Sequence, residues 1–454
     1  MAGQFVSAMF APNNATSYLA QYFEQSPSVM RRPLQQHSFY SNLFSLEDVG
    51  DLMSRFQRDG GASKKLLFGE EDDWNLVRKV WVDGGGGGGW TTQGVRKGTS
   101  LTHDEARGMF EREGYTLVVN HVEKYHDKVA LVVGEFESAL GHQVSANLYA
   151  TMPSTHERGT QGFAAHFDWM DGIIIQVAGC KRWRIYDRAV QLPVPDMVFQ
   201  FDTVASLESL TVVGEFDLSA GSALTIPRGW VHEAATNCSA DIMAALPANQ
   251  PSLHLTFGLE AAVTTSVEVL LHYYLESLGE SMTLDWNAWM WTHLCIHAVA
   301  ILEELGIALR KSLPSELLLS KPSAVSQDFV ESIQSAAKMS WQGLDFKKAS
   351  ALALDLLGDE CSATIQQKQH RKSLHKPLYI LPFLQQFKTY PSTESARRPI
   401  YLPLPRSWEG STEPTERQVA QVWNIAIERM TPGSIGEALE RLLAAKQRSY
   451  TAIP

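Results

Sequence analysis

The sequence of 454 residues predicts an α+β fold, in which an antiparallel double sheet of the jelly-roll or barrel type is flanked by helices. Between Val144 and Phe257, short runs rich in β-branched and aromatic residues alternate with Gly and Pro, as in jelly rolls and barrels. On either side of this region apolar residues recur at helical spacing. The hydrophobic content of 44% and the charged content of 20% are those of a globular chain. We therefore expect two or three domains with substantial cores.

The N-terminal region, residues 1–115, is predicted to hold helical and mixed elements that flank the double sheet. Tyr18, Leu19, Tyr22 and Phe23 recur at helical spacing, and Pro27 ends this run. The glycine tract at 84–89 predicts a flexible loop, because glycine loses the most backbone entropy on ordering. A phosphate-binding loop is disfavoured, since no Gly-Lys-Ser/Thr follows the tract.

The central region, residues 116–260, is predicted to begin with a strand at 116–119 and a helix at 121–140. The five clearest strands then follow at 148–150, 173–177, 182–186, 222–226 and 253–257. We expect residues 178–181 to form the hairpin turn between the second and third of these strands.

Beyond Ala261 the pattern returns to helix. One apolar stripe comprises Val267, Leu270, Leu271, Tyr274 and Leu278, and a second spans 286–305. Such stripes are typical of packing surfaces rather than of a cofactor site. The last part, residues 356–454, is predicted to contain short helices, a proline-rich connection and a final helix from about 435 to 447.

Composition excludes several classes of function. The net charge of −11 disfavours direct DNA binding, and no apolar run reaches the ~18–20 residues that span a bilayer. Residues 1–20 lack a basic segment followed by an apolar core, so we expect no secretory signal. The four cysteines have no Cys-x-x-Cys spacing, which predicts reduced thiols in an intracellular protein.

Chemistry is concentrated in Gln161–Asp168 and Pro227–His232. In a strand, residues i and i+2 point to the same side, so His166 and Asp168 would face one cavity. His232 would join them from a second strand. Two imidazoles and one carboxylate form a facial triad that holds Fe(II) and leaves open positions for a co-substrate and O₂. The alternative is that these are ordinary residues among the 14 histidines, since His-x-Asp alone is a weak signal.

An Fe(II) site of this kind needs an electron source to activate O₂, and 2-oxoglutarate is the candidate. Lys181 would form a charge-assisted bond to its distal carboxylate. Asn147 and Tyr149 are again i and i+2 on a strand, and would point an amide and a phenol into the same pocket. The alternatives are an exposed turn lysine at 181 and a core tyrosine with a satisfied hydroxyl at 149.

These segments together resemble the JmjC ribosomal oxygenase family, also described as bifunctional lysine-specific demethylases and histidyl-hydroxylases. The resemblance covers about residues 17–260. It rests on Tyr22–Pro27, Phe39–Phe44, Leu140–His142, Asn147–Tyr149, Gln161–Asp168, Gln176–Tyr186, Ile226–Ala234 and Ser252–Thr256. The chain departs from the family in the glycine tract and in a lengthened loop at 154–160.

The resemblance implies a double-stranded β-helix, or cupin-like, JmjC catalytic domain at 116–260. A helical dimerisation region would follow at 261–355 and a small winged-helix domain at 356–454, so a homodimer is expected. It further implies Fe(II) held by His166, Asp168 and His232, with 2-oxoglutarate bound through Lys181, Tyr149 and Asn147 and with O₂ as the oxidant. No catalytic residue beyond the metal centre is expected.

Three functions remain open. The first is hydroxylation of a protein side chain, with a ribosomal-protein histidine as the substrate that the resemblance implies. The second is demethylation of N-methyl-lysine in histones, which would use the same residues. The third is a non-catalytic scaffold on an oxygenase fold, and a small-molecule hydroxylase is a lesser possibility. The expected location is intracellular, nuclear or nucleolar in a eukaryote and cytoplasmic in a bacterium.

Overall fold

A computed structural model of the chain describes residues 4–11, 14–31, 40, 42–55, 57–59, 64–67, 74–82, 89–95, 99–153, 159–195, 207–282, 286–320, 325–342, 344–347 and 414–451. They form two compact units: residues 1–191 with 198–260, and residues 192–197 with 261–454. Whether the chain divides into the four predicted regions remains a prediction.

The first unit is built on an eight-stranded sheet with the strand order β1-β12-β9-β14-β8-β7-β4-β5. All neighbouring strands in it run antiparallel. The strand bounds are β1 Ser28–Arg31, β4 Trp74–Val82, β5 Gly89–Gly94, β7 Thr116–Val119, β8 Val144–Thr151, β9 Asp171–Ala178, β12 Ser222–Ile226 and β14 Ser252–Leu259. Four of the five strands predicted in the central region, those at 148–150, 173–177, 222–226 and 253–257, therefore lie in this sheet.

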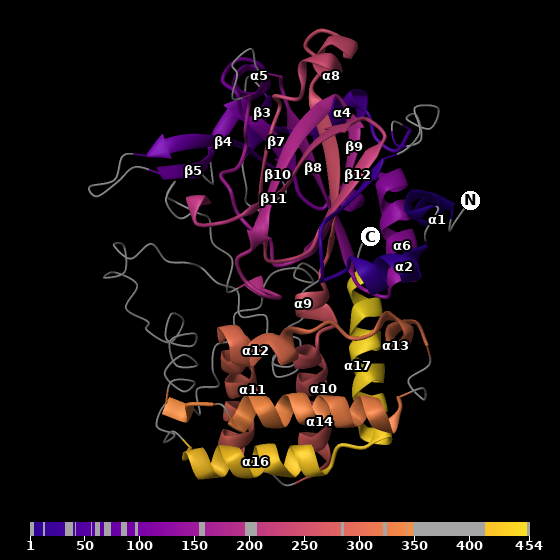
Figure 1. Ribbon diagram of the computed structural model, residues 1–454, viewed down its shortest axis with the longest axis vertical. Helices are drawn as coiled ribbons and strands as arrows, with labels where there is room; N and C mark the ends of the chain where they lie inside the picture. The colour runs from indigo at the N-terminus through magenta and orange to yellow at the C-terminus, as the bar shows by residue number, and fades with distance from the viewer. Residues whose placement is uncertain are drawn as a thin grey trace. The chain divides into compact units, whose positions relative to one another are not determined.

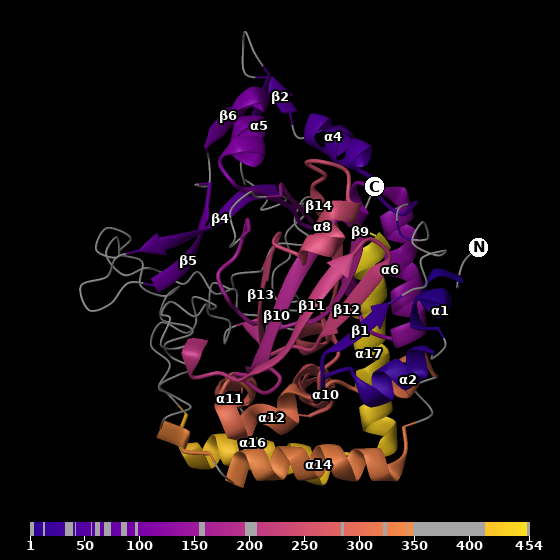
Figure 2. The ribbon, with the colours of Figure 1, turned by 45° about the horizontal axis from the view of Figure 1, so that its top comes forward.

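A three-stranded antiparallel sheet forms the second layer, with the order β11-β10-β13. Its strands are β10 Cys180–Arg188, β11 Val212–Ser219 and β13 Trp230–Ala235 (Figure 2). From β9 to β14 the chain crosses repeatedly from one sheet to the other. The space between the sheets is filled by a core of Ile174, Trp183, Ile185, Leu218, Leu224 and Ile226. The predicted jelly-roll type of double sheet is confirmed.

The turn at 178–181 differs from the expectation. Because β9 belongs to the large sheet and β10 to the small one, the turn connects two layers, and the predicted hairpin is wrong. Gly179 has φ +64°, and a Cβ there would collide with the carbonyl oxygen of Pro251. Only glycine fits such a position without strain.

Helices cover and extend the double sheet. Phe136 of α6 (Asp127–Leu140) packs against Phe257 of β14 with ring centroids 4.9 Å apart. The β4–β5 hairpin extends away from the central strands (Figures 1 and 2). A small sheet in the order β2-β3-β6 completes the unit. The remaining elements are α1 Gln4–Phe10, α2 Ala15–Gln21, α4 Leu46–Arg55, β2 Gln57–Asp59, β3 Lys64–Leu67, β6 Ser100–Thr102, α5 His103–Arg112, a 3₁₀ turn Val122–Lys124, α6 Asp127–Leu140 and α8 Ala240–Ala245.

The described part of the second unit is helical. Its core includes every residue of the predicted stripe from Val267 to Leu278, which confirms a packing surface. The predicted helix at 286–305 is interrupted: α11 ends at Ala300 and α12 begins at Glu303. The helices are α9 Ala261–Thr264, α10 Val267–Ser281, α11 Trp286–Ala300, α12 Glu303–Arg310, α13 Ser315–Leu319, α14 Gln327–Gln342, α16 Glu416–Glu428 and α17 Pro432–Thr451.

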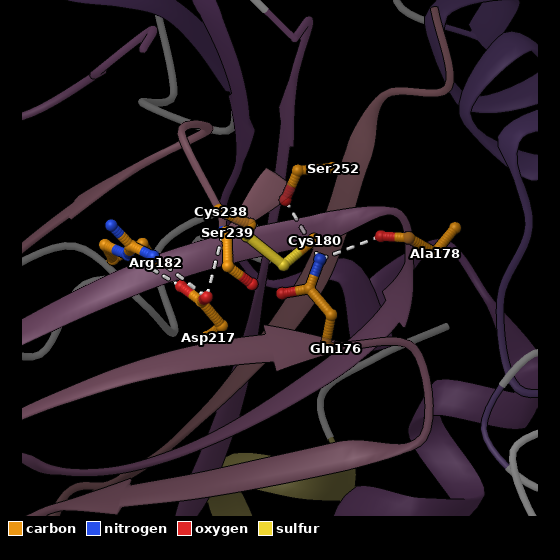
Figure 3. The surroundings of a disulfide bond; sticks show 8 residues. All are labelled: Gln176, Ala178, Cys180, Arg182, Asp217, Cys238, Ser239 and Ser252. Atoms are coloured by element: carbon orange, nitrogen blue, oxygen red, sulfur yellow. Dashed lines mark hydrogen bonds and ion pairs between the residues drawn. A yellow bond between two sulfur atoms is a disulfide. The ribbon is translucent and has the colours of Figure 1, made fainter. Parts of the chain in front are cut away.

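One expectation about cysteines is wrong. Cys180 and Cys238 form a disulfide, which links the first residue of β10 to the segment after β13 (Figure 3). Asp217 holds the same two segments together, because it accepts hydrogen bonds from the guanidinium of Arg182 and from the backbone N–H of Ser239. Spacing along the chain could not reveal this pair, because two different strands bring the cysteines together. Cys295 is a buried free thiol.

Several predicted features lie outside the described residues: the glycine tract up to Gly88, most of the 154–160 loop, and residues 348–413. Residues 414–451 contain α16 and α17, so the winged-helix domain stays a prediction. Within the described parts of the chain, no helix has the length and apolar character needed to cross a membrane.

Candidate metal centre

The three predicted ligands come from two neighbouring segments. His166 forms an isolated antiparallel bridge with His232 of β13, through backbone hydrogen bonds of 3.1 and 2.8 Å in the two directions. Asp168 lies in the loop before β9, so the predicted strand through both residues is wrong. The alternation nevertheless holds, because Phe167 is fully buried against Val231 while its neighbours face the cavity.

The ligand atoms of the triad converge. One atom from each of His166, Asp168 and His232 lies within 4.8 Å of the other two. The His166 Nε2 to Asp168 Oδ1 distance is 3.9 Å, and the His232 Nε2 to Asp168 Oδ2 distance is 3.6 Å. Two imidazole nitrogens and one carboxylate in this arrangement are the donor set of a facial triad for Fe(II).

Backbone carbonyls orient both imidazoles. The Nδ1 of His166 lies 2.7 Å from the carbonyl oxygen of Ala164, and the Nδ1 of His232 lies 3.1 Å from that of Trp230. With each Nδ1–H donating to a carbonyl, each Nε2 carries the lone pair that a metal requires. The residues present therefore fit a divalent metal.

Burial is uneven across the triad. The His232 side chain is 8% exposed, that of His166 20% and that of Asp168 42%. Burial, and then the nearby His166, lower the pKa of His232 below its ordinary value. A neutral imidazole is the form that binds metal. The site is therefore open on the side of the carboxylate.

Lys181 is the second residue of β10 and is buried, only 5% exposed. Its Nζ donates to Thr151 Oγ1 at 3.3 Å, and among the described residues no carboxylate pairs with it. Burial lowers the pKa of Lys181 to about 7. The alternative of an exposed turn lysine is therefore wrong, and the ammonium is available to an incoming anion.

Tyr149 and Asn147 have different surroundings. The Tyr149 ring lies in the cavity, stacked on His254 with centroids 4.8 Å apart, and burial raises the pKa of its hydroxyl. Asn147 hydrogen-bonds Tyr149 through its side chain, and its Oδ1 accepts from the backbone N–H of His121 at 3.1 Å. Asn147 is not among the described residues that line the cavity.

The triad, Lys181 and Tyr149 share one cavity of about 200 Å³. His254, Thr256 and Trp183 also line it, although they were not predicted as site residues. The alternation of His254 and Thr256 along β14 was the available signal, because both face the interior as Tyr149 does. The lining comprises Tyr149, Gly162, Phe163, His166, Asp168, Gly172, Ile174, Lys181, Trp183, Ile226, Pro227, His232, Glu233, Ala234, His254 and Thr256.

A second cavity of about 780 Å³ adjoins the first, with Glu233 and Ala234 lining both. Lys79 and Trp90 of the β4–β5 hairpin form one side, and Arg182 and Arg184 of β10 form another. Lys79 Nζ lies 2.8 Å from Glu233 Oε2, which ties the hairpin to the strand that carries His232.

An antiparallel double sheet with a convergent His-Asp-His triad defines a cupin-like fold with a candidate metal site. Comparison with protein families narrows this class: residues 121–265 match the JmjC domain family. Residues 121–265 are therefore similar to a JmjC domain, and the cupin-like fold implied by the sequence resemblance is confirmed.

Curated relatives cover part of the chain. Ribosomal oxygenase 2 of Rattus norvegicus is 26% identical over 233 residues, which are 51% of this chain and 44% of the rat protein. The bifunctional lysine-specific demethylase and histidyl-hydroxylase NO66 of Drosophila sechellia is 29% identical over 169 residues, or 37% of this chain and 23% of the fly protein. The matches thus span less than half the length of these relatives.

Solved structures are also similar. Among them is YcfD, a ribosomal oxygenase from Escherichia coli, in complex with cobalt and 2-oxoglutarate. The match has a TM-score of 0.37 at 17% identity and covers 59% of this chain and 57% of YcfD.

Proposed function

We propose that the protein is an Fe(II)- and 2-oxoglutarate-dependent oxygenase that hydroxylates a side chain of a protein substrate, with a ribosomal-protein histidine as the first candidate. The observation that carries the proposal is the shared cavity, in which the oriented triad and the buried Lys181 lie together. Buried charges in proteins are normally paired. Lys181 has no carboxylate partner among the described residues and lies in the same cavity as the triad, which indicates a site for an anion.

The metal would be held by the Nε2 atoms of His166 and His232 and by the carboxylate of Asp168. When bound, Fe(II) supplies oxidation of a substrate C–H bond by O₂, coupled to conversion of 2-oxoglutarate to succinate and CO₂. The chain contributes orientation of these groups and exclusion of water. Trp183, Ile174 and Ile226 give the cavity its apolar walls.

The distal carboxylate of 2-oxoglutarate would meet Lys181 and the Tyr149 hydroxyl. An ammonium donates a charge-assisted hydrogen bond to a carboxylate, and this bond is strongest away from water. Asn147 contributes indirectly, because it holds Tyr149 while its own oxygen accepts from His121. The fit is supported further by His254 Nδ1, a buried polar atom that lines the cavity and has no hydrogen-bond partner within the described structure.

A polypeptide substrate is favoured over a small molecule by space. The first cavity, at about 200 Å³, is smaller than the roughly 300–1,000 Å³ of usual ligand sites. The adjoining cavity of about 780 Å³ shares Glu233 and Ala234 with the first, is lined by no triad residue, and offers room for a peptide segment. The relatives named ribosomal oxygenases support a ribosomal protein as the substrate.

Demethylation of N-methyl-lysine is the second candidate, supported by the name of the NO66 relative. It requires the same triad and co-substrate, because hydroxylation of an N-methyl group leads to loss of formaldehyde.

A non-catalytic scaffold protein with this fold is the third candidate. A homodimer and an intracellular location, nuclear or nucleolar in a eukaryote, complete the proposal, and light scattering and fluorescence localisation would test them.

The decisive experiment is mass spectrometry of ribosomal proteins and histones incubated with the protein, Fe(II), 2-oxoglutarate and ascorbate. A gain of one oxygen that is absent with His232→Ala would establish a hydroxylase and identify its target. Loss of a lysine methyl group would establish a demethylase. If neither change occurred and no succinate formed with metal bound, the oxygenase proposal would be wrong.

A further inference from the structure

Two segments that are far apart in the sequence, Tyr22–Pro27 and Pro227–Trp230, meet at a buried cluster of charges. Arg228 is 1% exposed, and its guanidinium forms an ion pair with Glu24. Its Nε lies 3.7 Å from Asp171 Oδ2. Neither segment touches the metal cavity through a charged side chain, so the metal chemistry alone does not explain the cluster.

The N-terminal segment is held in this cluster through its backbone. Glu24 has φ +58°, a conformation that residues other than glycine adopt only when their surroundings impose it. Asp171 Oδ1 accepts the Glu24 N–H at 2.9 Å. Arg188 donates to the carbonyl oxygens of Glu24 and Gln25, each at 2.8 Å. The position of Glu24 is therefore determined by several independent contacts.

The charge cluster is connected to the ligand Asp168 through Gly229, next to Arg228, and through Asp171. The N–H of Gly229, the residue after Arg228, donates to the carbonyl oxygen of Asp168 at 3.0 Å. Gly229 has φ +85°, so this turn depends on glycine. Asp171, three residues after Asp168, lies inside the cluster itself. The loop that carries the carboxylate ligand is thus fixed at its centre by one turn and at its end by Asp171.

Charge makes the cluster dependent on Glu24. Two carboxylates, Glu24 and Asp171, face two guanidinium groups, Arg188 and Arg228. Loss of the Glu24 carboxylate would leave the two guanidinium groups facing Asp171 alone, and the surrounding backbone would have to shift or admit water to accommodate the excess positive charge. The first backbone to respond would be the Pro227–Trp230 turn that holds Asp168.

We propose that Glu24 is a positioning residue for the metal centre, which acts through Arg228 and the Gly229–Asp168 hydrogen bond to hold the carboxylate ligand in place. The inference rests on the proposed metal triad. It assigns to the N-terminal segment Tyr22–Pro27 a role in metal affinity, although none of its residues ligates the metal.

The test is titration of the metal-free full-length protein with Co(II), followed by calorimetry. We expect Glu24→Gln to weaken Co(II) binding by about 10- to 100-fold, the effect usual for residues that orient a ligand. Glu47→Gln, the same substitution at an exposed position of α4, is the matched control and should bind as the wild type does. An unchanged affinity in folded Glu24→Gln protein would overturn the proposal.

Additional variants separate positioning from folding. If Glu24→Gln does not fold, the double variant Glu24→Gln with Arg228→Met removes both charges, and replacement of a buried pair in this way is often tolerated. Its Co(II) affinity should also fall, whereas wild-type affinity would exclude a positioning role. Arg228→Lys keeps the positive charge but loses the guanidinium fork. We expect its Co(II) affinity to lie between those of the wild-type protein and Glu24→Gln. If the wild-type protein itself fails to bind Co(II), the assignment of the triad as a metal site is wrong, and the result is distinguishable from a failure of the role of Glu24.

Discussion

Two clusters of histidine and carboxylate side chains, one in each unit, have opposite designs. In the metal centre both imidazoles donate from Nδ1 to backbone carbonyls, and the Nε2 atoms converge with Asp168. In the helical unit, Glu268 and His272 of α10 meet His293 and His297 of α11. Because both clusters combine histidines with a carboxylate, their differences must come from the arrangement of these side chains.

The helical cluster is held together by hydrogen bonds among its own side chains. His297 Nδ1 donates to Glu268 Oε1 at 2.7 Å, and the Nδ1 atoms of His272 and His293 share a hydrogen bond of 2.8 Å. Burial opposes ionisation of Glu268, yet the contacts with His297 and His272 lower its pKa to about 2. Within the described residues, only the triad in the first unit brings three ligand atoms within 4.8 Å of one another. Residue type alone therefore does not make a metal site; orientation of the ring nitrogens does.

Removal of a ligand from the first cluster should have the largest effect. We expect His232→Ala to lower metal affinity and turnover by at least 100-fold, because two ligands hold a metal poorly and their orienting bonds cannot replace the third. Co(II) titration and succinate release would measure both. Full activity in this variant would contradict the triad.

The matched change in the second cluster should affect folding instead. His297→Ala leaves Glu268 buried without its main partner, which costs about 3–5 kcal/mol of unfolding free energy. Urea denaturation would measure the loss, and Co(II) affinity of the folded fraction should be unchanged. A fall in metal affinity equal to that of His232→Ala would show that the two clusters are not independent.

The disulfide beside the cavity should contribute a smaller, purely structural effect. Cys180 and Cys238 are separated by 58 positions, and closure of a loop of this length stabilises a fold by roughly 4 kcal/mol in the chain-entropy model. We expect Cys180→Ser with Cys238→Ser to lose about 2–4 kcal/mol in denaturant unfolding. Asp217 still joins the two segments, so Co(II) affinity should persist. Equal stability with and without the pair would exclude a structural role.

The smallest effect concerns pH and Lys181. Its pKa of about 7 means that the ammonium predominates below pH 7 and is lost above it. Because a carboxylate binds the charged form, the KM for 2-oxoglutarate should rise about tenfold between pH 6 and pH 8. Lys181→Met should have a high KM that no longer depends on pH in this range. A flat profile in the wild-type protein would assign the carboxylate to another group.

Much of the site was predictable because local chemistry encodes it. His166, Asp168 and His232 stand in short motifs, and the spacing of His166 and Asp168 predicts a shared direction whether or not a regular strand forms. The errors share one cause. The hairpin at 178–181, the strand through Asp168 and the reduced cysteines all depend on which distant segments lie next to each other, and a local pattern does not contain that information.

Sequence alone determined the elements and the candidate ligands, because hydrophobic periodicity and residue type are local properties. Tertiary structure decided the rest. It placed β9 and β10 in different sheets, and it buried Lys181 so that the pKa of this residue fell to about 7. It also joined Glu24 to Arg228, next to the loop that carries Asp168. Burial and electrostatic coupling arise only when segments far apart in the chain pack together. The same reason explains why two histidine clusters of similar composition have different roles.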